Sequence, residues 1–488
     1  MAGAAAVTGA AGAADAMAGA GAADVVAGAA AIAGAGAAGA SEALAAGGAS
    51  VLPGMGIAGV AGSAARRRSG VDIIRKRFGE KNEAAEKAAA AIIADVRARG
   101  DAALIDCTER FDGVRLSSIA VERDEIEAAA ASVEARGDGL MGTMRRAAAN
   151  IRAYHERQTR QGFVAHGCRD GVLMGQRVLP LERVGLYIPG GTAAYPSTLL
   201  MNAIPAKIAG VGDIVLATPP TADGSVAAPI LAAAALVGVE RIFKVGGAQA
   251  IAAMAYGTQT VPRVDKITGP GNAYVLAAKR QVYGIVDIEA LAGPSEILII
   301  ADSSADAAFV AADMLAQAEH DPMAASILLT TDERLARAVR AELGSQLASL
   351  PREGIAAQSL ADNGRIVVAR TLSEAAAISN AVAPEHLELC VAEPFALLSQ
   401  IRHAGSVFLG SYAPEALGDY FAGPNHTLPT NGAARFSSPL SVDDFVKKSS
   451  FLYYSKEAFA ADCADVAAFA RAEALDGHAR SAERRLGG

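Results

Sequence analysis

The chain has 488 residues, of which 52% are hydrophobic and 20% charged, and it contains no tryptophan. This length exceeds one compact core and predicts roughly two to four domains. The net charge is −8, and the longest basic block is the short run "ARRRSG". Because such a chain lacks a basic footprint for phosphates, we expect no nucleic-acid partner.

The cysteines are isolated along the chain and form no CxxC pair. They are Cys107, Cys168, Cys390 and Cys463. This spacing is not that of a disulfide framework, so a reducing, cytoplasmic location is expected.

Residues 1–68 are an extension made mostly of Ala and Gly. The stretch lacks the basic start and compact apolar segment of a secretory signal, and the Ser and Arg of a transit peptide. Asp15, Asp24 and Glu42 interrupt it, which argues against a membrane span, and we expect no membrane partner. We expect either a disordered tail that buries too little surface to fold, or a chain that truly starts at Met55. The extension is excluded from the predicted fold.

Helical patterns follow from Val71 to about residue 158, with a Gly-Asp break near Gly100. From Val184 short β-branched runs alternate with helical segments. The runs are "VGLYIP", "DIVLATPP", "RIFKVGG", "KITGPG", "ILIIAD", "ASILLTTD", "RIVVAR", "LELCV" and "SVFLG". Such alternation predicts parallel sheets joined by crossover helices.

The predicted fold class is therefore α/β, with two incomplete, doubly wound Rossmann-like domains and small helical segments at both ends. Residues 69–186 together with 293–440 are assigned to the first Rossmann-like domain, which includes the N-terminal helices. Residues 187–292 are assigned to the second, and residues 441–488 to a C-terminal helical dimerisation segment. The order of the strands cannot be predicted from the alternation.

Three Gly-rich turns stand at the ends of predicted strands: "YIPGG", "VGGAQA" and "GPGNAY". In open α/β sheets, ligands bind at the carboxyl ends of the strands, where helix N-termini offer free N–H groups to phosphates. A dinucleotide is thus one interpretation. Glycines that merely permit tight turns are the other, since no GxGxxG motif is present.

The segment "MLAQAEHDPM" ends an apolar helical pattern with polar groups. Gln317 and His320 are three residues apart, so on a helix both project from one face. His is a common zinc ligand and Gln an uncommon one, and a zinc site needs three or four ligands. By itself the segment therefore favours a polar helix end over a metal site.

The segment "APEHLEL" places Glu385 beside His386 before an apolar run. A carboxylate and an imidazole can act as an acid/base pair. In an extended strand, however, neighbouring side chains point to opposite faces, so both reach one substrate only if the chain turns there. Pro384 makes such a turn reasonable, and a solvated strand start is the alternative.

Two more segments carry potential metal ligands. "LGDYFAGPNHTLPT" contains Asp419 and His426, and "AEALDGH" contains Glu473 and His478. Polar loops of this density are common at functional sites, although surface turns use the same residues.

Taken in order, these motifs resemble the histidinol dehydrogenase family. "VGLYIPGG", "VGGAQAIAA", "GPGNAYV", "AGPSEILIIAD", "QAEHDP", "PEHLEL", "GDYFAGPNHTLPT" and "ARFSSPLSV" carry the resemblance, from about Val71 to the end. It implies an intertwined homodimer and an NAD-dependent, four-electron oxidation of L-histidinol to L-histidine through a bound aldehyde, the last step of histidine biosynthesis.

The resemblance also implies a role for each motif residue. The zinc ligands would be Gln317, His320, Asp419 and His478, and the catalytic pair Glu385 and His386. Besides the ligands and His386, the substrate would contact Ser295, His426 and Glu473. Tyr187, Gln249 and Asn272 would line the NAD site, and Glu473 and His478 would come from the partner subunit.

Two other functions are compatible with the residues alone. A zinc hydrolase would use Glu385 to activate water without a redox partner. A non-catalytic binding module would keep the fold without turnover, but the complete set of ligands and the intact Glu385–His386 pair argue against it.

Overall fold

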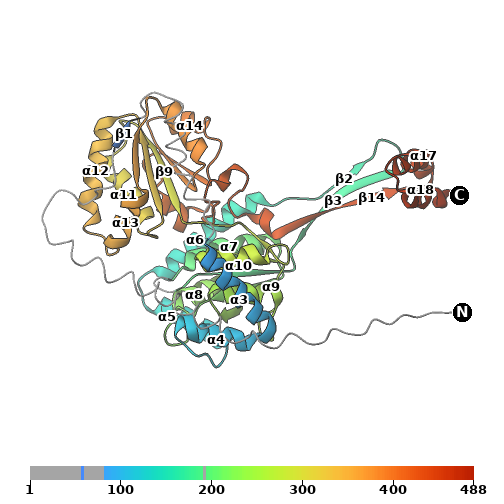
Figure 1. Ribbon diagram of the computed structural model, residues 1–488, viewed down its shortest axis with the longest axis horizontal. Helices are drawn as coiled ribbons and strands as arrows, with labels where there is room; N and C mark the ends of the chain where they lie inside the picture. The colour runs from blue at the N-terminus through green and yellow to red at the C-terminus, as the bar shows by residue number, and fades with distance from the viewer. Residues whose placement is uncertain (1–56, 60–81, 191–193, 488) are drawn as a thin grey trace, which may run out of the picture. The chain divides into compact units, whose positions relative to one another are not determined.

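The structure, a computed structural model, describes residues 57–59, 82–190 and 194–487. Its strands form a five-stranded and a six-stranded parallel sheet and a three-stranded antiparallel sheet. Helices flank both parallel sheets (Figure 1). The α/β class with two Rossmann-like sheets is therefore confirmed.

The five-stranded sheet has the strand order β6-β5-β4-β7-β8. Its strands are β4 (Arg183–Tyr187), β5 (Asp213–Thr218), β6 (Arg241–Lys244), β7 (Lys266–Thr268) and β8 (Asp287–Ile288). The connecting helices are α7 (Pro196–Ala209), α8 (Ala228–Val237), α9 (Gly247–Tyr256) and α10 (Ala273–Val282). This is the Rossmann order without its last strand, and the order reverses between β4 and β7.

The six-stranded sheet has the order β1-β11-β10-β9-β12-β13. Its strands are β1 (Ile57–Gly59), β9 (Glu296–Ala301), β10 (Ala325–Thr330), β11 (Arg365–Val368), β12 (His386–Cys390) and β13 (Ser406–Leu409). Its helices are α11 (Ala307–Ala318), α12 (Glu333–Leu347), α13 (Glu353–Asn363), α14 (Leu372–Val382) and α15 (Pro394–Leu398). Apart from β1, it repeats the order of the first sheet, with the reversal between β9 and β12.

Strand β1 lies inside the Ala/Gly-rich stretch that the sequence analysis excluded from the fold. It pairs in parallel with β11 at the edge of the six-stranded sheet. The rest of residues 1–68, including Met55, lies outside the described residues.

Each of the nine predicted β-branched runs forms a strand of one of these two sheets. Every residue of β9, β10 and β12 is buried. Strands covered by helices on both faces are expected to be apolar throughout, and β9 nearly is. Strand β12 differs, because it buries the polar residues His386 and Glu388 between apolar ones.

The N-terminal helices pack on the five-stranded sheet, so their assignment to the other Rossmann-like domain was wrong. They are α3 (Glu83–Arg99), α4 (Asp101–Asp112), α5 (Arg123–Ala135) and α6 (Leu140–His155). Helix α3 contacts α9 and α10, α5 contacts α8, and α6 contacts α7. Ala85 and Ala89 of α3 are fully buried in the same core cluster as the inner residues of α9. A helical period predicts an apolar face but not which sheet that face covers.

The antiparallel sheet was not predicted. It joins β14 (Val446–Tyr454), β3 (Val172–Pro180) and β2 (Phe163–His166), in the order β14-β3-β2. Residues 441–488 are therefore not wholly helical, and only α17 (Lys456–Ala472) and α18 (Asp476–Glu483) match that prediction. The register of β14 with β3 brings together segments about 270 residues apart, which local patterns cannot reveal.

No helix in the described ranges has both the length and the apolar character that are needed to cross a bilayer.

Candidate active site

Glu385 and His386 lie at the amino end of β12, beside the amino end of β9. Ala383 just before them adopts a left-handed conformation with φ of 56°, which turns the chain into the strand. The Glu385 carboxylate accepts a hydrogen bond from the Glu296 backbone N–H at 2.9 Å. Its Oε2 lies 3.7 Å from Nδ1 of His386. The turn thus brings adjacent residues to one site, although a regular strand would separate them.

The His386 ring is buried and surrounded by acceptors. Its Nδ1 lies 3.2 Å from the Glu296 carbonyl oxygen and 3.8 Å from Glu415 Oε1. Its Nε2 lies 3.5 Å from Oδ1 of Asp419. Burial alone would lower the pKa of His386, but the charges of Glu415, Glu385 and Asp419 outweigh burial and raise this pKa well above 6.5. The three carboxylates therefore stabilise the positive charge of the protonated ring.

The carboxyl group of Glu385 can take up and release a proton near neutral pH. Burial raises its pKa to about 7, and the nearby His386 charge opposes part of this effect. The Ser295 side chain also lowers the pKa of Glu385, which places this predicted substrate contact near the same site. A carboxylate with a pKa close to the operating pH is suited to general acid/base work.

Gln317 and His320 lie at the end of α11, next to His386. Gln317 is fully buried. With its amide oriented so that Oε1 accepts from His320 Nδ1 at 3.0 Å, its Nε2 donates to Glu415 at 3.1 Å and lies 3.2 Å from His386 Nδ1. Burial lowers the pKa of His320 and so favours its neutral form. The helix end that the sequence left ambiguous is therefore part of the site.

Asp419 lies in the π-helical turn Gly418–Ala422, an uncommon geometry that often marks functional sites. Burial opposes its ionisation, but the hydrogen bond and charge from His386 lower the pKa of Asp419 below its usual value. The Asp419 carbonyl oxygen lies 2.9 Å from Nδ1 of His426. The loop thus delivers both predicted residues to the cluster.

The sequence analysis missed Glu415, which completes the cluster. Glu415 is 3% exposed, and burial raises its pKa to about 8. His386, Glu415 and Asp419 each offer an atom within 4.8 Å of the others, an arrangement that could hold a metal ion. Glu415 is four residues before Asp419 and so shares its helical face. That spacing was the available signal.

Glu473 and His478 are the two predicted site residues that the single chain does not bring to this cluster. They belong to the C-cap of α17 and to α18, and both are exposed. Neither has a contact with the cluster among those found in the described residues.

The predicted NAD-lining residues stand around the strand-order reversal of the other sheet. The Tyr187 hydroxyl at the end of β4 accepts from the Gly247 N–H at 3.0 Å, and burial raises the pKa of Tyr187 to about 12. Gln249 is buried near the N-terminus of α9. Asn272 caps α10, where its Oδ1 accepts from two backbone N–H groups. Ligands of open α/β sheets bind at this position.

The "GPGN" turn at this edge is held by a buried ion pair. Lys279 Nζ donates to the Gly269 carbonyl at 2.6 Å and to Glu289 at 2.7 Å. Glu289 in turn accepts from the Gly269 N–H at 2.8 Å. Gly269 has φ of 117°, and a Cβ there would lie 1.9 Å from the Tyr187 carbonyl oxygen, so only glycine fits.

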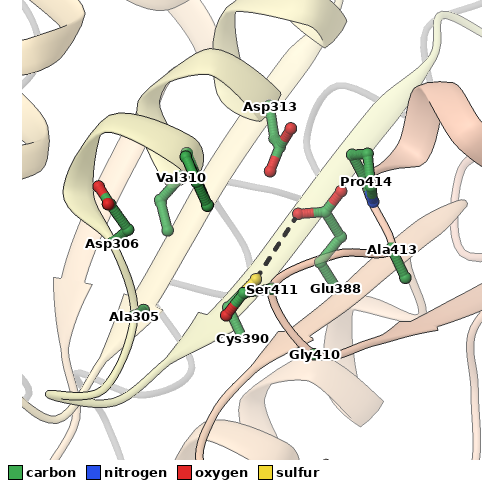
Figure 2. Close-up of a pocket in the computed structure, with 11 residues that line it drawn as sticks. Ala305, Asp306, Val310, Asp313, Glu388, Cys390, Gly410, Ser411, Ala413 and Pro414 are labelled. Carbon is green, nitrogen blue, oxygen red and sulfur yellow. Dashed lines mark hydrogen bonds between the residues drawn. The ribbon is translucent and has the colours of Figure 1, made fainter.

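The carboxyl edge of the six-stranded sheet is acidic instead (Figure 2). A pocket at the ends of β12 and β13 contains Asp313 and Glu388, whose carboxyl groups point toward each other. Burial raises the pKa of Asp313 to about 6, and burial with the Asp313 charge raises that of Glu388 well above its usual value.

Two Rossmann-like sheets and a buried carboxylate–imidazole cluster are compatible with an α/β oxidoreductase. A family model described as histidinol dehydrogenase matches residues 75–486. The histidinol dehydrogenase of Halalkalibacterium halodurans is 53% identical over 401 residues, which are 82% of this chain and 94% of that protein. That of Geobacillus kaustophilus is 53% identical over 421 residues, covering 86% of this chain and 98% of the relative.

A solved structure agrees with these relatives. The crystal structure of histidinol dehydrogenase from Elizabethkingia anophelis superposes with a TM-score of 0.83 at 39% identity, covering 90% of this chain and 99% of that one. The chain belongs to the histidinol dehydrogenase family, whose members are oxidoreductases of histidine biosynthesis. The resemblance stated from the motifs is therefore confirmed.

Proposed function

We propose that this chain oxidises L-histidinol to L-histidine in two NAD-dependent steps, through an aldehyde that stays bound, at a site with one zinc ion per subunit. The observation that carries the proposal is the buried Glu385–His386 pair beside Gln317, His320 and Asp419. Proton acceptors and potential metal ligands lie in one cluster. The proposed reaction uses both, because a base must take the proton of the alcohol and the metal would bind the imidazole of the substrate.

His386 acts in the first step. As hydride leaves the alcohol carbon, the hydroxyl proton must go to a base within hydrogen-bond reach. The imidazole is buried and its ring faces three carboxylates, so the positive charge that it gains is stabilised. This arrangement favours proton transfer toward the ring.

Glu385 acts in the second step. The aldehyde must add water before it can lose another hydride, and a carboxylate removes the proton from that water. Glu385 is suited to this because its pKa of about 7 leaves it able both to accept the proton and to release it. Bound NAD would accept each hydride at the site lined by Tyr187, Gln249 and Asn272.

The proposed zinc ligands are in the protonation states that metal binding needs. The lowered pKa of His320 keeps its ring neutral, and the lowered pKa of Asp419 keeps its carboxylate ionised. With the amide oxygen of Gln317 they supply oxygen and nitrogen donors, which zinc accepts. When bound, zinc would orient the substrate's imidazole and amino nitrogens. The fourth ligand would be His478 of the partner subunit.

The dimer is proposed from the surface of the antiparallel sheet. Eight of the nine residues of β14 are exposed, a burial pattern unlike that of a strand inside a fold. Large exposed apolar side chains gather on β2, β14 and α17: Phe163, Val164, Phe451, Leu452, Tyr453, Tyr454, Val466 and Phe469. A second copy that covers this surface would bring its exposed Glu473 and His478 to the cluster. Ser295 and His426 of the first chain would also contact the substrate there.

The rate of histidinol oxidation should depend on pH through Glu385. A base must be ionised to act, so kcat/KM should rise as the pH increases through about 7, where burial has placed the pKa of this carboxyl. A pH profile of the initial rate of NADH formation measures this. An acid limb near pH 4.5, the ordinary value for a glutamic acid, would contradict the assignment.

Removal of zinc tests the metal site. A chelator should abolish histidinol oxidation and added Zn²⁺ should restore it, measured by NADH absorbance and metal analysis together. His320→Ala should lose zinc. His386→Ala should keep it and lower kcat by about 100-fold or more, as loss of a general base does.

The His386→Ala result also separates two ligand sets. If this variant loses zinc as completely as His320→Ala does, the ion is held by His386, Glu415 and Asp419 instead.

We further propose a cytoplasmic location, because Cys107, Cys168, Cys390 and Cys463 are all free thiols.

A further inference from the structure

Helices α6 and α7, which cover the five-stranded sheet, hold the loop that carries His426. The Asn150 side chain of α6 donates to the Phe421 carbonyl at 2.9 Å. The Asn425 side chain donates to the Met201 carbonyl of α7 at 2.6 Å and lies 3.3 Å from Nε2 of His155 on α6. The loop between Asp419 and Thr430 is thus fastened to the sheet that bears the proposed NAD site.

The position of each proton in this contact follows from its neighbours. Nδ1 of His155 lies 2.8 Å from the Ile151 carbonyl oxygen, which can only accept, so Nδ1 carries the hydrogen. The Asn425 amide orientation is fixed as well, because its Oδ1 accepts from the Thr427 N–H at 2.9 Å while its nitrogen faces Met201. Nε2 of His155 must therefore be the acceptor for the Asn425 N–H.

His155 is fully buried and is used by no step of the proposed reaction. Burial lowers its pKa, and the carbonyl groups of Ile151 and Leu440 oppose this only in part. The ring therefore stays neutral, as an acceptor at Nε2 requires. A buried histidine in a single tautomer, with a partner on each nitrogen, does not titrate near neutral pH and holds its two partners in fixed positions.

We propose that His155 is a positioning residue for the oxidation of histidinol: through Asn425 it holds His426 in place against the Asp419 backbone. The proposal rests on the proposed function, in which His426 contacts the substrate. Asn425 is bonded covalently to His426, whose Nδ1 lies 2.9 Å from the Asp419 carbonyl oxygen. A shift of Asn425 would consequently move both the substrate contact and the turn that carries Asp419.

Two substitutions separate this role from a simple role in helix stability. In His155→Gln the amide oxygen takes the place of Nε2 and can still accept from Asn425, whereas the bond to Ile151 is lost. In His155→Asn the amide nitrogen takes the place of Nδ1 and can still donate to Ile151, whereas the acceptor for Asn425 is lost. His403→Gln, on the loop after α15 and outside the proposed site residues, is the control.

His155→Gln should keep kcat/KM for histidinol within about threefold of the unsubstituted protein. His155→Asn should lose about tenfold or more, mainly through a higher KM for histidinol, with KM for NAD unchanged. His403→Gln should change nothing. Equal losses in the two His155 variants, or an unchanged His155→Asn, would overturn the proposal.

Hydrogen exchange decides the proposal without relying on activity. Amides of residues 423–430 should exchange about tenfold faster in His155→Asn and at the ordinary rate in His155→Gln, with both variants folded by circular dichroism. If the unsubstituted protein fails to oxidise histidinol, the proposed function is wrong. Hydrogen exchange alone then tests whether His155 holds the loop through Asn425. Unchanged exchange of this loop in His155→Asn would refute it.

Discussion

Glu385→Gln is expected to lower kcat for histidinol oxidation by about a thousandfold, within the range for loss of a general base. The amide keeps the size of the side chain and can no longer accept a proton from water. Because His386 remains, the first hydride transfer should survive, and a single turnover should yield close to one NADH per active site. Rapid-mixing measurements of NADH absorbance give both the amplitude and the rate.

Glu393→Gln is the matched control for this variant. Glu393 follows the same strand, is exposed and makes no side-chain capping bond, so its substitution should leave turnover unchanged. A Glu385→Gln enzyme that completes both oxidations at more than a tenth of the normal rate would assign the activation of water to another group.

Mixed dimers should recover activity from two inactive variants. Glu385→Gln and His478→Ala homodimers are each expected to be inactive, the second because each site lacks the proposed partner ligand. In a heterodimer, one site combines both defects and the other has neither. Random reassortment of equal amounts should therefore restore about a quarter of the original activity.

The readout is NADH formation after the two variants have been unfolded and refolded together, compared with the same variants refolded separately and then mixed. Activity that stays at the level of the separate variants, although heterodimers form, would show that His478 serves the site of its own chain. Metal analysis of the His478→Ala homodimer should show zinc bound weakly or not at all.

Much of the fold could be predicted from local pattern. Strand β9 is an almost continuous apolar run between helices, and this pattern is typical of buried parallel strands. The pairing of β14 with β3 could not be predicted, because β14 is almost wholly exposed, β3 is only partly buried, and neither shows the alternation of a half-buried sheet. The helix α3 was placed on the wrong sheet for a related reason, since its alanine-rich face fits any apolar surface.

Most residues of the candidate site were predicted through the resemblance of their motifs to the histidinol dehydrogenase family. Gln317, His320, Glu385, His386 and Asp419 were all identified from the sequence, and the structure brings them into one cluster. Glu415 was missed because a carboxylate in "APEALG" looks like a solvated helix start, whereas the fold buries it beside His386. Burial of a charge is a property of tertiary packing, and a sequence does not display it.

The edge of the six-stranded sheet at which the candidate site lies was not predicted either. Ligands of open α/β sheets usually lie at the carboxyl ends of the strands. Glu385 and His386 instead lie at the amino end of β12, whereas Asp313 and Glu388 line a separate pocket further along the strand (Figure 2).

The ratio of NADH formed to histidinol consumed tests the central claim most directly, because a single cluster is proposed to carry out both oxidations. With zinc-loaded protein and excess NAD, the account predicts two NADH and one histidine for each histidinol, without free aldehyde. One NADH per histidinol, with aldehyde accumulating in solution, would contradict it.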